Sequence, residues 1–158
     1  MKQLRFDNDT LTLEVEEPTI STYLRQQCSY HLRTMKIYSR VISEPPPSAE
    51  TLIALDDSII GSWLARVPQW FDDNATYTMN AQYALVHGLN VWRFRNLRIV
   101  MFRPFLVKWA SQDATQEQSW DEQIATERCL QAASESITHI QAFWNANLHA
   151  RLTAFYVL

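Results

Sequence analysis

One long apolar segment near the middle of the chain constrains the fold most. From residue 83 to residue 102, apolar side chains recur at the 3.6-residue period of an α-helix and cover a face too wide for a surface helix. We therefore expect this helix to lie at the centre of a bundle. It should end before Pro104, because proline lacks an amide hydrogen and disfavours helical geometry at the preceding residue. Its apolar positions are Leu85, Val86, Leu89, Trp92, Leu97, Ile99, Val100 and Phe102.

Glycine is too scarce for a turn-rich β fold. The chain has 2 glycines and 6 prolines among 158 residues, and 47% of its residues are hydrophobic. This composition favours helices joined by proline-marked loops around an ordinary hydrophobic core. The sequence therefore predicts an all-α protein, an irregular helical bundle of about five to six helices.

The first 18 residues differ from the rest. Apolar and polar residues alternate weakly, and five acids occur near the start with no base among them. A short hairpin and an acidic extended arm both fit this pattern, because an isolated two-stranded ribbon is marginal without a core beneath it. Residues 19–158 then form the predicted helical domain.

Two helices are expected before the central one. The first runs from about residue 19 to residue 43, and the second begins after the cap residue Ser48 and stops at Pro68. Gly61 within the second helix suggests that a neighbouring helix approaches closely there. The predicted buried stripes are Ile20, Leu24, Cys28, Leu32, Met35 and Ile42 in the first helix, and Leu52, Leu55, Ile59, Trp63 and Val67 in the second, with Asp56 and Asp57 off the stripe.

A last long helix follows a polar loop. Ser119 and Glu122 have the spacing of a capping box, in which each side chain accepts from the other residue's amide. The core face predicted for this helix consists of Ile124, Leu130, Ile137, Ile140 and Trp144. Residues 148–158 look like a further apolar helix without a stop signal, which suggests that the chain is a piece of a longer domain.

Catalytic and metal-binding patterns are weak. Glu135 with His139, and Cys28 with His31, each place two candidate ligands on one helix face, but the further ligands that a site needs are missing. No phosphate-binding loop, nucleophile elbow or zinc-protease motif occurs. We therefore expect no enzyme, no metal site and no cofactor in this chain.

Two roles are possible for the arginines of the central segment. Arg95 and Arg98, beside Trp92 and Phe94, could form a surface that stacks on nucleic-acid bases. The favoured reading is structural, with arginine stems packed on the helix and guanidinium groups paired to acids such as those of residues 113–122. A net charge of −3 gives no general attraction to phosphate backbones.

Four segments of the predicted helices carry a combined pattern. They are Leu32-x-x-Met35-x-Ile37-Tyr38-Ser39-x-Val41, Trp63-x-x-x-Val67-Pro68-x-Trp70-Phe71, Leu97-x-Ile99-x-Met101-Phe102-Arg103-Pro104-Phe105-Leu106 and Cys129-Leu130-x-Ala132-Ala133-x-Glu135-Ser136-Ile137. Together they resemble the middle homology region of fungal zinc binuclear-cluster transcription factors. The resemblance covers residues 19–158.

The resemblance implies a nuclear, non-catalytic regulatory module that is part of a larger all-α domain. Such a module controls transcription through contacts within its own protein, with regulators or the transcription machinery, with a small-molecule effector or in a homodimer. The family's six-cysteine zinc cluster is absent here, so zinc and DNA contact would belong to an upstream part. This chain itself is expected to bind neither nucleic acid nor membrane.

The resemblance assigns structural roles to seven residues. Trp63 and Pro68 would anchor the second helix, while Arg103 would pair with an acid or cap the end of the central helix. Pro104 would set a turn. Arg98 belongs to the same motif, and Phe105 and Leu106 would plug the bundle.

Two alternatives remain open. The same bundle could hold a cavity for an apolar small molecule, as Trp- and Met-rich helical bundles do. A helical enzyme would instead show titratable side chains that converge in a cleft.

Overall fold

The described residues of the computed structural model form helices joined by loops. The structure describes residues 20–67, 81–111 and 117–146. The helices are α1 (Ile20–Val41), α2 (Ala49–Leu55), α3 (Ser62–Leu64), α4 (Ala81–Ser111) and α5 (Trp120–Asn145), with a π-helical turn, Asp56–Gly61, between α2 and α3. No strand occurs within these ranges. The predicted all-α class is confirmed.

The helix count is lower than predicted. Because α2, the π-helical turn and α3 follow one another without a break, the described ranges contain four continuous helices instead of five or six. The predicted arm or hairpin at residues 1–18, the stop at Pro68 and the last helix at residues 148–158 all lie outside the described residues.

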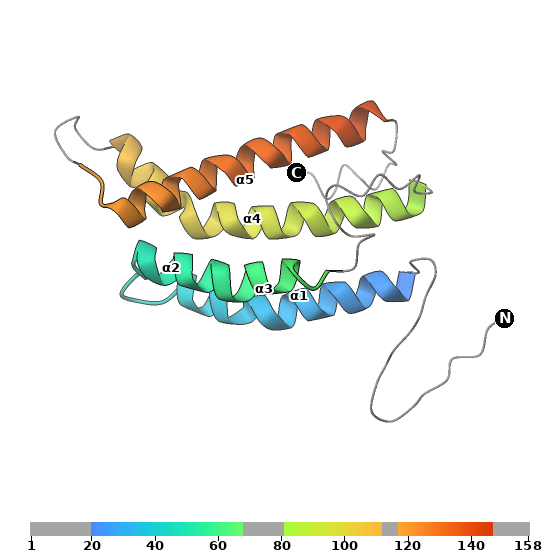
Figure 1. The fold of residues 1–158 in the computed structure, drawn as a ribbon, viewed down its shortest axis with the longest axis horizontal. Helices are drawn as coiled ribbons and strands as arrows, with labels where there is room; N and C mark the ends of the chain where they lie inside the picture. The colour runs from blue at the N-terminus through green and yellow to red at the C-terminus, as the bar shows by residue number, and fades with distance from the viewer. Residues whose placement is uncertain (1–19, 68–80, 112–116, 147–158) are drawn as a thin grey trace, which may run out of the picture.

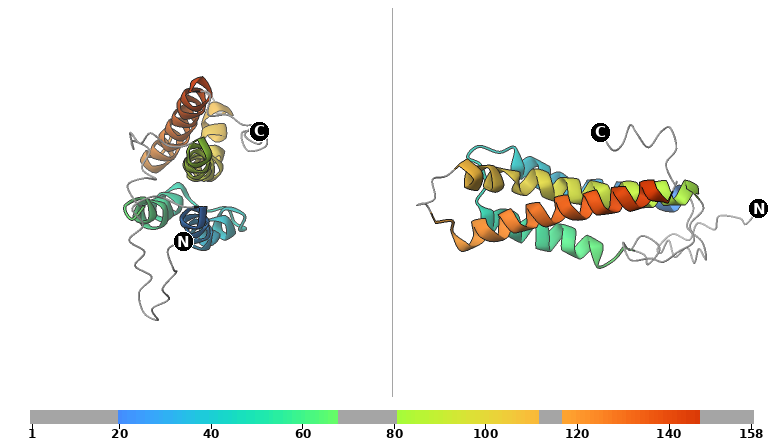
Figure 2. Two further views of the ribbon diagram at one scale, coloured as in Figure 1. Left: turned by 90° about the vertical axis from the view of Figure 1, so that its right-hand side faces the viewer. Right: turned by 90° about the horizontal axis from the view of Figure 1, so that it is seen from above.

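Successive helices run antiparallel in two layers. One layer holds α1 beside the continuous α2–α3 rod, and the other holds α4 beside α5, as the end-on view in Figure 2 shows. Across the layers, α4 contacts α1 and α2, and α5 contacts α2. Because α4 contacts all the other helices, it occupies the central place that its apolar sequence predicts.

The central helix does not stop at Pro104. It continues for seven residues to Ser111, with Pro104 inside it, and Figure 1 shows its last part leaving the line of the rest. Proline removes one hydrogen bond and crowds the carbonyl four residues back, which bends a helix without having to end it. The helix continues because Met101 and Phe102 are fully buried before the proline and Phe105 packs against the core after it.

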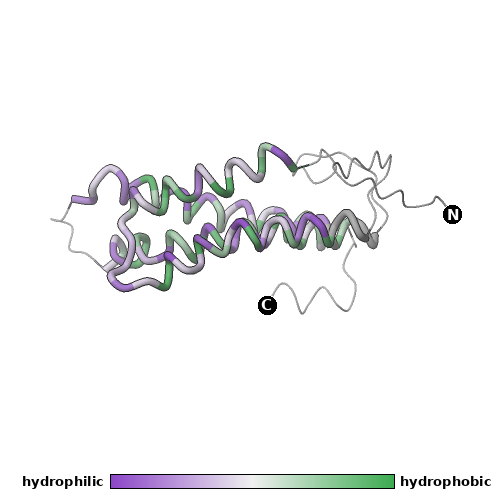
Figure 3. Tube along the Cα trace, turned by 90° about the horizontal axis from the view of Figure 1, so that it is seen from below, coloured by the Kyte–Doolittle hydropathy of each residue, from purple (hydrophilic) through white to green (hydrophobic). Residues whose placement is uncertain are grey.

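The first helix buries a different face from the one predicted. Its predicted apolar stripe faces outward, and a more polar face packs on the bundle through Gln27, Tyr30, Thr34 and Ile37. These polar groups find partners: Gln27 Nε2 donates to Asn90 Oδ1 at 2.8 Å, and the Tyr30 hydroxyl donates to the Arg93 carbonyl at 3.1 Å. Satisfied hydrogen bonds make burial of this face possible. Figure 3 shows hydrophobic and hydrophilic stretches alternating along every helix.

The second helical rod largely follows its prediction. Ser48 caps α2 by accepting from the Thr51 amide, and Leu52 and Trp63 are buried. The prediction that Asp56 lies off the buried stripe is wrong, because Asp56 is fully buried. The predicted close approach of a neighbouring helix to Gly61 is not found among the described residues, where a Cβ at Gly61 would meet only the Asp56 carbonyl of its own rod, at 3.8 Å.

The last helix is capped as predicted but is rotated from its predicted face. Ser119 and Glu122 form the complete capping box. Leu130, Ile137 and Trp144 are exposed, and the buried face carries the smaller residues Ala125, Cys129 and Ala132 with Phe143. Small side chains let α5 approach α4 closely, which leaves the large apolar residues at the edge of the contact.

Candidate functional site

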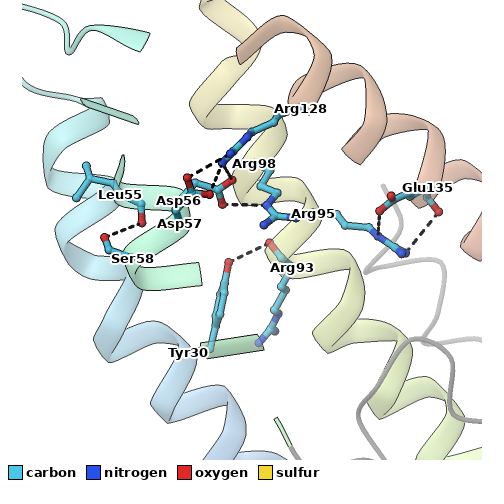
Figure 4. Close-up of polar contacts among 10 residues, drawn as sticks. All are labelled: Tyr30, Leu55, Asp56, Asp57, Ser58, Arg93, Arg95, Arg98, Arg128 and Glu135. Carbon is cyan, nitrogen blue, oxygen red and sulfur yellow. Dashed lines mark hydrogen bonds and ion pairs between the residues drawn. The ribbon is translucent and has the colours of Figure 1, made fainter. Parts of the chain in front are cut away.

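A buried carboxylate joins three helices. Asp56 lies in the π-helical turn after α2 and its side chain is fully buried. Arg98 of α4 donates from Nε to Asp56 Oδ1 at 2.9 Å, and Arg128 of α5 donates from Nη1 to Asp56 Oδ2 at 2.7 Å (Figure 4). Two cations on one carboxylate compensate the cost of burying its charge.

Further ion pairs surround this carboxylate. Arg128 also donates to both carboxylate oxygens of the exposed Asp57, at 2.7 and 3.3 Å. The hydrogen bond to Asp57, with that to Asp56, raises the pKa of Arg128 against the opposing effect of burial. Arg95 pairs with Glu135 of α5 at 3.2 Å. We call Asp56, Asp57, Arg98 and Arg128 the acid–arginine cluster.

The acid–arginine cluster supports the structural reading of the central arginines. The guanidinium group of Arg98 lies over the Phe94 ring, with its Cζ atom 5.9 Å from the ring centre, and pairs with Asp56. The ion pairs that the structure describes for Arg95 and Arg98 are with Glu135 and Asp56, and not with the predicted acids of residues 113–122. Only Glu122 of that segment pairs with a base among the described residues, and that base is Lys108, at 2.6 Å.

The residues assigned by the resemblance are dispersed. Trp63 packs against Tyr30, with ring centres 5.2 Å apart, and Pro68 lies outside the described residues. Phe105 and Leu106 pack against the core, as expected. Arg103 is exposed and makes no ion pair with any described residue. The predicted pairing of Arg103 with an acid is therefore not supported.

Two histidines meet at the interface of α4 and α5. His87 and His139 have ring centres 6.1 Å apart, and the indole Nε1 of Trp92 donates to His139 Nδ1 at 2.9 Å. The predicted pairing of His139 with Glu135 overlooked both neighbours. Among the described residues, no group of three or more His, Cys, Asp or Glu side chains is arranged to hold a metal ion.

An apolar groove lies beside the bend in α4. It has a volume of about 450 Å³ and lies between the loop before α2, the second half of α4 and the start of α5. Its apolar lining is Val41, Pro46, Pro47, Ala49, Leu52, Met101, Pro104 and Phe105, and its polar rim includes Ser48, Glu50, Lys108, Asp121 and Glu122. Pro104 and Phe105, two residues of the resemblance motif, therefore belong to the same concavity.

The outer side of α1 exposes several large apolar side chains. Leu24, Leu32, Met35 and Ile42 are 56%, 73%, 62% and 80% exposed. Their spacing places them on one side of the helix. We call these four residues the outer α1 face. Large apolar side chains left in water along one side of a helix are typical of a surface that binds another molecule.

Sequence reasoning missed Asp56 and found the outer α1 stripe without its orientation. An aspartate between Leu55 and Asp57 gives no periodic signal for burial, and its two arginines are more than 40 residues away in sequence. The sequence identified the stripe on α1 as apolar. Whether the stripe is buried or exposed depends on how α1 packs against the other helices, which no local pattern encodes.

No described helix is both long and apolar enough to cross a membrane. No family model, curated protein or solved structure matches this chain.

Proposed function

We propose that this chain is a non-catalytic regulatory module of a fungal transcription factor of the zinc binuclear-cluster kind, and that it acts by binding protein segments. The observation that carries the proposal is the outer α1 face, four large apolar side chains more than half exposed on a helix whose other side is packed. A folded protein can keep such a surface in water. Covering the surface with another helix lowers the free energy, because apolar area is removed from water.

The arrangement of polar groups also favours a binding module over an enzyme. The charged groups of the acid–arginine cluster are paired with one another across helices, so each carboxylate is held by an arginine of the same cluster. In this proposal the cluster holds the helices in place while the outer α1 face makes the regulatory contact. Zinc and DNA binding would belong to an upstream segment, and the protein would act in the nucleus.

A reporter assay tests this proposal. The chain is placed between a heterologous DNA-binding domain and an activation segment, and transcription of a reporter gene is measured in a fungal cell. The double variant Leu32→Glu with Met35→Glu should change reporter output at equal protein level, because two charges prevent apolar burial on the outer α1 face.

The control is Val107→Glu, a matched change at an exposed apolar residue on α4. This variant should leave reporter output unchanged. Equal output from the wild-type chain and the double variant would contradict the proposal.

A second candidate function is binding of an apolar small molecule. The groove at Pro104 and Phe105 favours it, because about 450 Å³ with a largely apolar lining is in the range of small-molecule sites. A ligand at a hundred times its dissociation constant would stabilise the protein by about 2.7 kcal/mol. A thermal-shift screen of apolar metabolites, repeated with Met101→Ala to alter the groove, tests this candidate. A shift that the variant leaves unchanged would exclude the groove as the site.

A further inference from the structure

The exposed surface of α1 is divided into two parallel sectors. The first is the outer α1 face, which extends from Leu24 to Ile42, the residue directly after α1, or about 27 Å at the rise of an α-helix. The second consists of basic residues, all exposed: Arg25, Arg33, Lys36 and Arg40. At 3.6 residues per turn, the basic sector begins where the apolar sector ends, on the side away from the contact with the bundle.

The charge on α1 has a single sign. Residues 20–41 contain four Arg or Lys side chains and no Asp or Glu. An ordinary surface helix mixes both signs along its solvent face. A helix that combines an exposed apolar stripe with a basic stripe therefore has a surface that an acidic, apolar partner would complement.

We propose that this combined surface binds an acidic amphipathic helix from a partner protein. The inference rests on the proposed function and states the chemistry of its partner. The apolar side of the partner helix would pack on Leu32 and Met35, and its carboxylates would lie opposite Arg25 and Lys36. This is side-by-side helix packing, in which apolar contact supplies affinity and the flanking charges select the partner and its orientation.

A second copy of the chain fits this surface less well. In a symmetric dimer the same patch meets itself, so the basic sectors of two α1 helices would be brought near each other with no acid on either helix to offset them. Like charges across an interface oppose association.

A lipid surface also fits less well. Helices that lie in a membrane interface carry basic residues on the polar face and commonly Trp or Phe on the apolar face. Residues 20–41 contain no Trp and no Phe. One flank of the apolar stripe borders the bundle instead of a basic sector, since Gln27, Tyr30 and Thr34 are buried beside it. A rod-shaped partner lying along α1 meets both sectors at once.

Peptide binding to the purified chain tests the inference. The probe is a designed, fluorescently labelled helical peptide with leucine at every third or fourth position and glutamate along one flank. Its matched control has lysine in place of each glutamate. Fluorescence anisotropy should show that the glutamate peptide binds at least about tenfold more tightly than the lysine peptide. The difference should shrink as salt is added, because exposed charges are screened.

Two substitutions locate the site. Lys36→Glu should weaken binding of the glutamate peptide by about tenfold, because one attractive charge becomes repulsive beside the apolar stripe. Arg103→Glu makes the same change of charge at an exposed position on α4 and should leave binding unchanged. Leu32→Gln should also weaken binding without altering the circular dichroism spectrum, because Leu32 is exposed.

Four results would overturn the inference. They are equal binding of the two peptides, equal loss in Lys36→Glu and Arg103→Glu, self-association that Leu32→Gln abolishes while the glutamate peptide does not bind, and binding to phosphatidylserine vesicles without binding to the peptide. If the peptide fails while the reporter assay still responds to changes on the outer α1 face, the chemistry assigned to the partner is wrong and the regulatory role stands. If both fail, the proposed function is wrong as well.

Discussion

At the scale of single residues, Asp56 contributes most to the joining of the helices. Its carboxylate is fully buried, yet both of its oxygens accept from arginines on other helices, at 2.9 and 2.7 Å. A buried ion pair is often no better than an apolar contact of the same shape, but removing one partner leaves the rest uncompensated. About a quarter of each side chain of Arg98 and Arg128 is exposed. Water can therefore solvate part of their charge when the carboxylate is removed, which reduces the destabilisation.

Replacement of this carboxylate should be costly. We expect Asp56→Ala to lower the free energy of unfolding by about 3 kcal/mol, because two arginines lose their shared partner. Urea unfolding followed by circular dichroism measures the change. The control is Asp57→Ala, which removes an exposed partner of the same Arg128 and should cost at most about 1 kcal/mol. Equal losses in the two variants would show that burial of Asp56 has no special weight.

Ionisation of Tyr30 lowers the stability of the folded protein at alkaline pH. Burial, followed by the nearby Tyr38, raises the pKa of the Tyr30 hydroxyl above its ordinary value of 10.0. Since the folded state then holds its proton more tightly than the unfolded state, its contribution is complete below pH 10 and is lost as the pH rises further.

The substitution Tyr30→Phe isolates this effect. The variant should lose about 1 kcal/mol at neutral pH, because the hydrogen bond to the Arg93 carbonyl disappears. Its stability should then fall less steeply than that of the wild type between pH 9 and 11. The residual slope would include Cys129, whose thiol pKa is also raised by burial. Parallel pH profiles of the two proteins would refute the assignment to Tyr30.

At the scale of elements, Pro104 shows that a strong local signal can be overridden. The missing amide hydrogen leaves the Val100 carbonyl without its usual helical donor, yet α4 continues to Ser111. Buried apolar residues on both sides of the proline stabilise the helical path by more than the interruption costs. Local propensity is a weak prior when tertiary contacts oppose it.

Removal of the proline should strengthen α4. We expect Pro104→Ala to raise the free energy of unfolding by about 1 to 3 kcal/mol, because the substitution restores one helical hydrogen bond at an exposed position. The neighbouring change Arg103→Ala should shift stability by no more than about 0.5 kcal/mol, since its exposed side chain pairs with no described acid. Thermal unfolding of both variants provides the comparison. A loss of stability in Pro104→Ala would mean that the bend itself is required.

The amphipathic helices show what periodicity can and cannot predict. The sequence correctly placed α1, the start of α2 and the capping box of α5, because these depend on spacing and local hydrogen bonds. It assigned the wrong buried faces to α1 and α5. Each helix has two faces able to pack, and partners distant in the sequence decide between them: Asn90 for Gln27 of α1, and α4 for the small residues of α5.

At the scale of the whole molecule, the predicted class and the central helix are confirmed, whereas the spatial order of the helices was not predicted. The all-α class follows from composition, and the central place of α4 follows from its wide apolar surface. The two-layer arrangement places Asp56 beside Arg98 and Arg128, and His87 beside His139. Such pairings between residues more than 40 positions apart have no signature in local sequence.

The arrangement also separates two kinds of surface. Apolar and charge-paired contacts between the helices hold the bundle together, and the outer α1 face remains uncovered. The binding proposals therefore depend on one structural fact, the orientation of α1 on the bundle. If α1 were rotated to bury Leu32, both the regulatory surface and its basic flank would disappear.

The most direct test compares two alanine substitutions five residues apart on α1. Ile37 is fully buried and Leu32 is 73% exposed. In urea unfolding, Ile37→Ala should lower the free energy of unfolding by about 2 to 5 kcal/mol, and Leu32→Ala should change it by no more than about 0.5 kcal/mol. The reverse order, with Leu32→Ala the more damaging substitution, would contradict the orientation of α1 and the binding surface built on it.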